Sequence, residues 1–512
     1  MSQLTRCAVL PGLLLAAGLV MARSAAAQGA AATEGAATPA ATKADDSEES
    51  AAGPTKAAAE AAQTVPVPAP PTRPPAEPNA ALNEDEIDAP SDHWETFSNG
   101  RIGSFVTYSK GEGMPQGTTY DPVTGLARHQ VNGEAGGTGD AYTTTNVVKV
   151  FPAPADGSPA TRILVSTIDS WRIRSGFTGN VVGLGVKRRL GDTKVTGYIS
   201  VTSIVDSQSQ KKYFQSTPDF REGYIKLEGK WGSVLMGRAA TLFDRGAVET
   251  DFMYLHGYGA GFPGDLKSSG GFPTGGQIGF GVLANGYAAG LVYATPKLAG
   301  VQLSVGLFDP AAFIGTAYER TRLPRPEFEL TVDEPIGSLA KVHVYFNGGY
   351  QKSYQNNLPD TLTERISGLG YGARVEVGPV HVGVGGHRGR GLGFAYPGLT
   401  SSAADDAVST FRDTDGVFAM GQLVLWKFDL DGGYGKSIIH MTPNDLTADP
   451  TNPSGDPKTS FVNSQAAVSG AVVFHAADWL HFDVDVMHAD SEWDLGEHQR
   501  INFYNAGTTI TW

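Results

Sequence analysis

Short segments in which apolar and polar side chains alternate recur through residues 93–512. In KVHVYFNGGY (341–350), Val342, Val344 and Phe346 share one face, and the residues between them are charged, polar or amphipathic. A period of two indicates a β-strand with one apolar face and one wet face. Because the region shows no amphipathic helical pattern longer than a turn or two, the sequence predicts an all-β domain.

The length and charge of these segments favour a membrane barrel over a soluble sandwich. Most run about ten residues, which is the length that a tilted strand needs to cross the hydrocarbon layer. In LHFDVDVMH (480–488), ionisable side chains occupy the middle of the wet face, where a water-filled lumen would accommodate them. The connections alternate between short and long, as in outer-membrane barrels. A secreted β-sandwich that binds glycans is the soluble alternative.

Placing strands between these connections predicts an even number of them, as a closed antiparallel barrel requires. The predicted strands lie near residues 101–109, 180–190, 194–204, 221–230, 233–242, 285–295, 300–309, 326–334, 340–350, 365–377, 380–391, 415–428, 430–441, 463–476, 479–492 and 501–512. Residues 163–177 also alternate, but their phase breaks at Gly179. They are expected either to extend the second strand through a bulge or to form structure in the first loop.

The chain ends on a β-prone segment, INFYNAGTTITW, whose final residue is Trp512. An unpaired strand edge in lipid would leave backbone groups without hydrogen bonds, so the last strand must pair with the first. Trp512 would then lie at the membrane interface, where aromatic rings are favoured. Trp231 and Trp479, which fall at predicted short turns, are expected to join it at the periplasmic side.

The first 27 residues are typical of a secretory signal peptide. They combine Arg6, a short apolar run, and Ala25 and Ala27 in an A-x-A arrangement. Cys7, the single cysteine of the chain, lies inside this segment. A mature chain cut after residue 27 would therefore have neither a disulfide nor a thiolate site.

Residues 28–92 form an Ala-, Pro- and acid-rich segment with almost no large apolar side chains. Such a segment cannot bury enough surface to fold, so we expect a disordered periplasmic spacer or tether. The formal charge of the whole chain is −14, of which residues 28–95 contribute −10 and the signal peptide +2. The remaining −6 on residues 96–512 argues against nucleic-acid binding, which would need a basic face.

Several stretches, taken in order, resemble the general Gram-negative porin family over roughly residues 95–512. EGYIKLEGKWGSVLMGRAATLFDRG (222–246) resembles the paired strands that lead into the third loop of that family. GAGFPGD (259–265) is similar to the acidic segment of its constriction loop, and NGYAAGLVYATPKLAGVQLSVGLF (285–308) to the hairpin that follows. GLGVKRRLGDTKVTGYI (183–199) resembles the second hairpin.

The resemblance implies a 16-stranded outer-membrane barrel whose third loop folds into the lumen. It also implies a homotrimer in contact with outer-membrane lipid and lipopolysaccharide, which passes ions and small hydrophilic solutes by passive diffusion. No enzymatic activity, cofactor or metal is expected. The predicted constriction residues are Asp244, Glu249, Asp251 and Asp265 on the loop and Arg238, Arg172, Arg174 and Arg189 on the wall. The acidic balance predicts mild cation selectivity.

Three alternatives stay open at this stage. Stacked aromatics in the pore would favour a substrate-selective channel for sugars, and Tyr254, Tyr258 and Phe262 in the third loop keep that alternative open. A channel for oxyanions would need a ladder of lysines, which the strand patterns do not reveal. An outer-membrane barrel enzyme would need catalytic residues at the rim. His381 and His387 share one strand face, but a metal site would need further ligands.

Overall fold

The structure is a computed structural model of the whole chain. It describes residues 93–112, 130–131, 144–151, 161–203, 219–254, 257–259, 276–283, 285–311, 318, 320–337, 339–356, 362–394, 410–443, 459–460, 462–493 and 498–512. The predicted signal peptide and the segment 28–92 lie outside these residues. Among the described residues, no helix is both long enough and apolar enough to cross a membrane.

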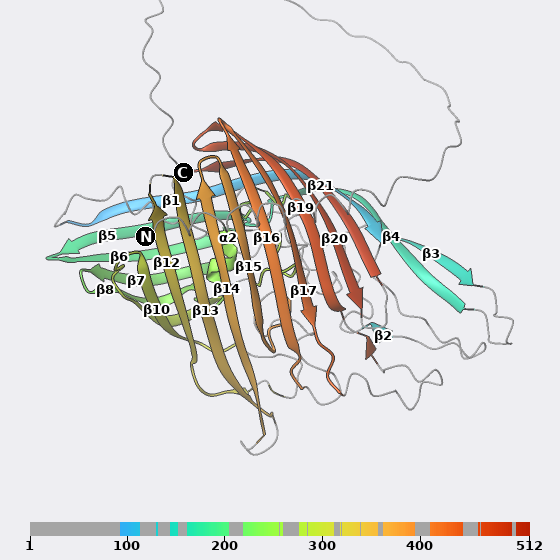
Figure 1. Cartoon of the computed structure of the whole chain (residues 1–512), viewed down its shortest axis with the longest axis horizontal. Helices are drawn as coiled ribbons and strands as arrows, with labels where there is room; N and C mark the ends of the chain where they lie inside the picture. Colours follow the sequence, from blue (N-terminus) through green and yellow to red (C-terminus); the bar gives the residue numbers. More distant parts are fainter. Residues whose placement is uncertain are drawn as a thin grey trace, which may run out of the picture. The chain divides into compact units, whose positions relative to one another are not determined.

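Sixteen strands form a closed antiparallel barrel, as predicted (Figure 1). The wall consists of β1 (Glu95–Glu112), β5 (Asn180–Leu190), β6 (Thr193–Ser203), β7 (Asp219–Gly229), β8 (Gly232–Ala240), β9 (Tyr287–Ala294), β10 (Val301–Phe308), β12 (Arg325–Ile336), β13 (Ala340–Tyr354), β14 (Thr363–Val377), β15 (Val380–Arg390), β16 (Asp413–Leu425), β17 (Phe428–Ile439), β19 (Val462–Ala477), β20 (Leu480–Trp493) and β21 (His498–Thr511). Smaller elements are β2 (Gln130–Val131), β3 (Thr144–Phe151), β4 (Thr161–Arg174), β11 (Arg320–Thr321), β18 (Thr459–Ser460) and the six-residue helix α2 (Arg245–Thr250).

The last strand closes the ring against the first, as the terminal sequence predicts. β1 and β21 pair from Arg101 opposite Thr511 to Gly111 opposite Ile501, and Figure 1 shows them side by side. The closure extends to the final residue, because the Trp512 N–H donates to the Gly100 carbonyl at 3.1 Å and the Gly100 N–H donates back at 3.0 Å.

The region left open by the sequence, residues 163–177, is mainly strand. β4 pairs with the loop-side half of β1, and β5 pairs with the other half, so the two act as one interrupted wall strand. The interruption falls where Gly176 and Gly179 both adopt positive φ values, of 78° and 67°. Glycine reaches this backbone region without a steric penalty, which explains the break in phase.

The two faces of the wall differ in the way that the alternation predicts. On β20, Val484 is 57 % exposed on the outer face, whereas Asp483 and Asp485 on the inner face are 3 % and 1 % exposed. Because residues paired between neighbouring strands point to the same side of the sheet, this inside–outside alternation continues around the barrel. Trp231, Trp479 and Trp512 lie at the end of the short turns, where all three are exposed.

Candidate functional site

The segment after β8 enters the lumen and is fixed to the β12–β13 wall by its own backbone. The N–H groups of Leu242 and Phe243 donate to one carboxylate oxygen of Glu327, at 2.8 and 2.9 Å. The N–H of Asp244 donates to Oδ1 of Asn347 at 3.0 Å. Glu327 and Asn347 are inward-facing and buried. This anchoring supplies partners for loop amides that would otherwise lie without hydrogen bonds inside the barrel.

Helix α2 continues along the same side of the lumen. Gly246 lies so close to Tyr345 that an added Cβ would fall 2.2 Å from the ring. Arg245 forms an ion pair with the buried Glu329, and Nη1 of Arg374 donates to the Glu249 carbonyl at 2.9 Å. A glycine at the contact therefore lets the helix backbone pack directly on the wall.

The loop then crosses to the opposite side of the barrel. The Gly259 N–H donates to Oδ2 of Asp485 on β20 at 2.8 Å, and the Phe177 N–H donates to the Tyr258 carbonyl at 3.1 Å. The Tyr258 hydroxyl lies 3.1 Å from both carboxylate oxygens of Asp251. The described parts of the loop thus connect the β12–β14 wall with the wall around β20 and the β4–β5 junction.

The returning part of the loop docks on β17 and β19. The Gly281 N–H donates to the Ser437 hydroxyl at 2.9 Å, and Nε2 of Gln277 donates to the Ser469 hydroxyl at 2.7 Å. Gly281 has a φ of 93°, and an added Cβ would lie 2.1 Å from the carbonyl oxygen of Val417. Only glycine fits this approach of loop to wall.

Two acidic residues of the loop, both outside the strands, are buried and accept hydrogen bonds from other loop residues. Asp244 is fully buried and accepts the Leu283 N–H at 3.0 Å, and burial raises its pKa well above the usual range. Burial raises the pKa of Asp251 to about 7, against the opposing effect of hydrogen bonds from the Met253 N–H and the Tyr258 hydroxyl. Asp244 and Tyr258 also have positive φ values, of 61° and 62°, a strained conformation for residues other than glycine.

Acidic side chains gather on the inner wall beside the loop. Asp431 of β17, Ala471 of β19 and Asp485 of β20 lie in one register row, with Asp483 next along β20. The small Ala471 side chain leaves the carboxylates on either side without a bulky residue between them. Arg101 of β1 is 7 % exposed, and it interacts electrostatically with Asp483, although none of the described residues forms a hydrogen bond with its guanidinium.

A basic cluster lies on the inner wall near the short-turn end of β5, β6 and β7. Lys187 and Lys226 are the register partners of Thr196 on its two sides, and Lys194 precedes Thr196 on the same face. Lys187 pairs with Glu95 at 3.3 Å, while Lys194 and Lys226 share Glu228 at 3.4 and 2.7 Å. Sequence reasoning did not bring these lysines together, because three strands contribute one each.

An aromatic row adjoins this cluster on the same inner face. The rings of Phe97 and Tyr198 are stacked with centroids 6.2 Å apart, and Tyr224 follows at 5.4 Å from Tyr198. The Tyr198 hydroxyl donates to Oδ1 of Asn99 at 3.0 Å. The tyrosines that the sequence singled out behave differently, because Tyr258 is buried and Tyr254 packs edge-on against Phe177.

The structure places the predicted constriction residues in different environments. Asp244 and Asp251 are buried within the loop, whereas the Glu249 side chain is 22 % exposed beside Arg245. Arg174 faces inward and is buried, and Arg189 has an inward register position close to the turn before β6. Arg172 also has an inward register position, opposite Thr107. Asp265 lies outside the described residues.

Arg238 requires a correction. Its register partner is Ala289, and it shares the outer face of β8 with the exposed Met236. Gly237, which precedes it, takes the inward position opposite Tyr224. Nε of Arg238 donates to the Arg221 carbonyl at 3.2 Å, near the loop end of the outer face. The glycine–arginine motif therefore directs its glycine, and not its arginine, into the lumen.

Among the lumen residues that sequence reasoning did not assign are Arg101, Asp431, Asp483 and the lysine cluster. The alternation around Asp483 placed it on a wet face. Its proximity to Asp431 could not be inferred, because the two residues lie 52 positions apart and on strands that do not pair directly.

A barrel of this kind with a loop fixed inside its lumen defines an outer-membrane channel. The family model described as Gram-negative porin matches residues 155–453, which is more than half of the chain. The protein belongs to the Gram-negative porin family.

The chain is similar to solved structures at low sequence identity. The outer membrane channel DcaP of Acinetobacter baumannii is 14 % identical, with a TM-score of 0.53 over 83 % of this chain and 99 % of that one. An anion-selective porin from Comamonas acidovorans is 10 % identical, with a TM-score of 0.49 over 82 % of this chain and 100 % of that one. The comparison with curated protein sequences gives no match.

Proposed function

We propose that this porin is a passive diffusion channel for ions and small hydrophilic solutes, with a mild preference for cations. The observation that carries the proposal is a loop hydrogen-bonded across the lumen between walls that bear charged side chains. Such a loop narrows the water path, and fixed charges beside a narrow wet gap favour polar solutes over apolar ones. The acids around Asp431 and Asp483 lie in this region.

Reversal potentials across a planar bilayer under a KCl gradient test the selectivity. The wild type is expected to favour potassium, and the Asp431→Asn/Asp483→Asn variant should lie closer to neutrality in alkaline salt, where buried carboxylates are ionised. In water, a unit charge on the wall changes the energy of an ion passing about 7 Å away by about 0.6 kcal/mol. This energy corresponds to a change of about threefold in the local concentration of that ion.

The matched control is Asp415→Asn/Asp490→Asn, which removes two carboxylates from the outer face and should leave the reversal potential unchanged. A wild-type channel that favours chloride would refute the cation preference without refuting the channel itself.

The lysine cluster supports a second candidate, a channel that selects oxyanions. Thr196, between Lys187 and Lys226, has a buried hydroxyl for which the described chain offers no hydrogen-bond partner. A hydroxyl flanked by two ammonium groups suits a phosphate or carboxylate. Concentration-dependent block of chloride current by inorganic phosphate, lost in Lys187→Gln/Lys226→Gln, would favour this candidate.

The assembly and the N-terminal segment belong to the same proposal. We infer a homotrimer in the outer membrane, in contact with its lipids and lipopolysaccharide. Residues 1–27 would direct export and be removed, and residues 28–92 would remain as a periplasmic spacer or tether.

A further inference from the structure

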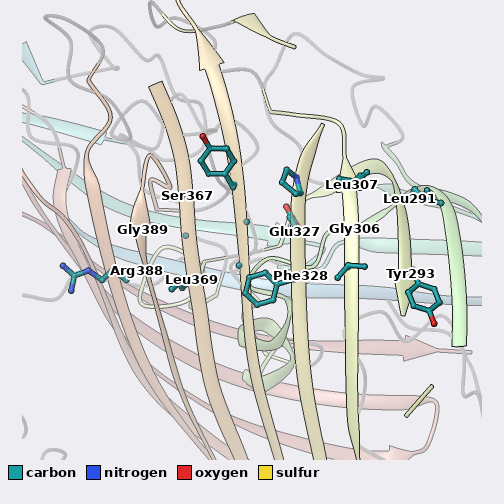
Figure 2. A pocket seen from close by; sticks show the side chains of 16 residues that line it. Leu291, Tyr293, Gly306, Leu307, Glu327, Phe328, Ser367, Leu369, Arg388 and Gly389 are labelled. Atoms are coloured by element: carbon teal, nitrogen blue, oxygen red, sulfur yellow. The ribbon is translucent and has the colours of Figure 1, made fainter. Parts of the chain in front are cut away.

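An apolar groove of about 820 Å³ crosses the outer side of the wall between β9 and β15 (Figure 2). It runs obliquely across the wall, from Tyr293 near the short-turn end of β9 to Arg388 near the loop end of β15. Its apolar lining includes Leu291, Val305, Leu307, Phe328, Tyr350 and Leu369. Figure 2 shows Leu291 and Tyr293 at one side of the groove and Arg388 at the other.

Small residues on the outer face create the recess. Gly348 of β13 lies in register between Phe328 of β12 and Leu369 of β14. An added Cβ at Gly348 would lie 2.8 Å from the Phe328 ring and 3.0 Å from the carbonyl oxygen of Gly368. Ser367, two residues before Leu369 on the same face, also lines the groove. The floor is therefore backbone and small side chains, while larger apolar side chains form the sides.

Cationic side chains adjoin the loop-side end of the groove. Lys352 and Arg365 are direct register partners on the outer faces of β13 and β14. Like charges placed directly opposite each other destabilise a sheet. Arg388 of β15 is the register partner of Leu369, and its side chain is 80 % exposed. The outer face thus changes, along the barrel axis, from apolar below to cationic above.

Among the residues that the structure describes, the nearby carboxylates do not balance this cluster. Asp415 lies 3.5 Å from Arg388, and Glu364 lies 3.4 Å from a fourth cation, Arg390. The Lys352 ammonium lies 5.3 Å from the centroid of the Tyr354 ring, which attracts a cation but does not neutralise it. The opposed pair Lys352 and Arg365 therefore calls for an anion from outside the wall.

We propose that this groove binds an anionic lipid of the outer leaflet, with acyl chains along the apolar recess and the phosphate at Lys352, Arg365 and Arg388. The proposal deepens the lipid contact named above and depends on the same placement of the barrel in the membrane. A lipid matches the site because its apolar acyl chains are followed, along the membrane normal, by a charged headgroup. The apolar recess and the cations of the wall follow one another in the same order. A protein partner, by contrast, would have to present both an apolar ridge that fills the groove and an acidic patch that meets the cations.

Native mass spectrometry of the full-length protein, titrated in detergent with phosphatidylglycerol, tests this site. Phosphatidylcholine with the same acyl chains is the neutral comparison. The Lys352→Gln/Arg365→Gln/Arg388→Gln variant should bind phosphatidylglycerol on the order of 100-fold more weakly, because each cation near an anionic lipid contributes roughly a factor of five. The matched control, Lys110→Gln/Lys436→Gln/Arg500→Gln, removes three outer-face cations elsewhere and should bind like the wild type.

A second variant keeps the test decisive if the charge changes disturb folding. Ser367→Leu fills the recess and retains all cations, so it should weaken binding of both lipids. Equal binding of phosphatidylglycerol by the wild type and both site variants would overturn the proposal. A Ser367→Leu protein that loses subunits without any change in lipid binding would also overturn it, in favour of a second copy in the groove.

Single-channel currents recorded from the same preparations separate this proposal from the proposed function. Site variants that lose phosphatidylglycerol but keep wild-type currents support the lipid site. Lipid binding as predicted, in a protein that carries no current, would leave the lipid site standing and contradict the diffusion channel.

Discussion

Deleting residues 498–512 is expected to abolish the folded barrel. These residues comprise Trp512 and β21, which pairs with β1 along one edge and with β20 along the other. Without β21, both neighbours would present unpaired N–H and C=O groups to lipid, at several kcal/mol for each unsatisfied group. The deletion also removes Asn505, whose Nδ2 donates to Asp485, the residue that holds the lumen loop at Gly259.

The measurement is the shift in gel migration between heated and unheated samples, together with resistance to protease. The wild type should show both properties of a folded barrel, and the deletion variant neither. Trp512→Ala is the control, because the hydrogen bonds between Trp512 and Gly100 are made by the backbone and survive the change. A deletion variant that still migrates as a compact, protease-resistant species would show that the ring does not close through β21.

Replacing Gly281 with valine is expected to release the lumen loop from the wall and to raise single-channel conductance. The residue has a φ of 93°, and an added Cβ would lie 2.1 Å from the Val417 carbonyl and 2.8 Å from the Lys436 amide nitrogen. A β-branched residue in such a conformation costs on the order of 1–3 kcal/mol before any clash is counted. The hydrogen bond from the Gly281 N–H to Ser437 would be lost as well.

Single-channel conductance and current noise, recorded in the same salt as the wild type, measure this effect. Gly223→Val is the control, because the space around an added Cβ at Gly223 is open to 4 Å and the residue faces outward. Gly281→Ala should give an intermediate result, since it introduces the same Cβ without branching. Unchanged conductance in Gly281→Val would mean that the docked loop does not limit the current.

The local pattern predicted the wall well, because strands and turns depend on neighbouring residues. In β13, Val344 and Phe346 lie on the exposed outer face and Tyr345 and Asn347 are buried inward, as the alternation requires. The closure by the last strand followed from the cost of an open edge in lipid. Strand ends were predicted less well: β1 extends at its loop end to Glu112, whereas β8 and β17 end at Ala240 and Ile439, two residues before the predicted ends.

The lumen was harder to predict, because its contacts join residues far apart in the chain. The hydrogen bond between Gly259 and Asp485 spans 226 positions, and no local signal marks either residue as the partner of the other. Asp251 was predicted to line the constriction because its segment resembles the third loop of the family, but in the structure it is a buried acceptor for Met253 and Tyr258. The lysine cluster was missed because its members come from three separate strands.

Arg238 shows how a motif can mislead about orientation. Gly237, which precedes it, lies where the backbones of two strands approach closely. An added Cβ at Gly237 would lie 2.3 Å from the Gly223 carbonyl oxygen. Because side chains alternate along a strand, the inward glycine commits the next residue to the outer face. Reading the phase of β8 from Val234 and Met236 would have placed the arginine outside.

Current through single molecules in a planar lipid bilayer tests most directly whether this closed ring of strands encloses a path for water. Purified full-length protein is expected to insert and to give discrete steps whose size is proportional to voltage and increases with salt concentration. Grouping of the steps in threes would support the trimer. Protein that inserts as a folded, protease-resistant barrel and yet carries no ionic current would contradict the account.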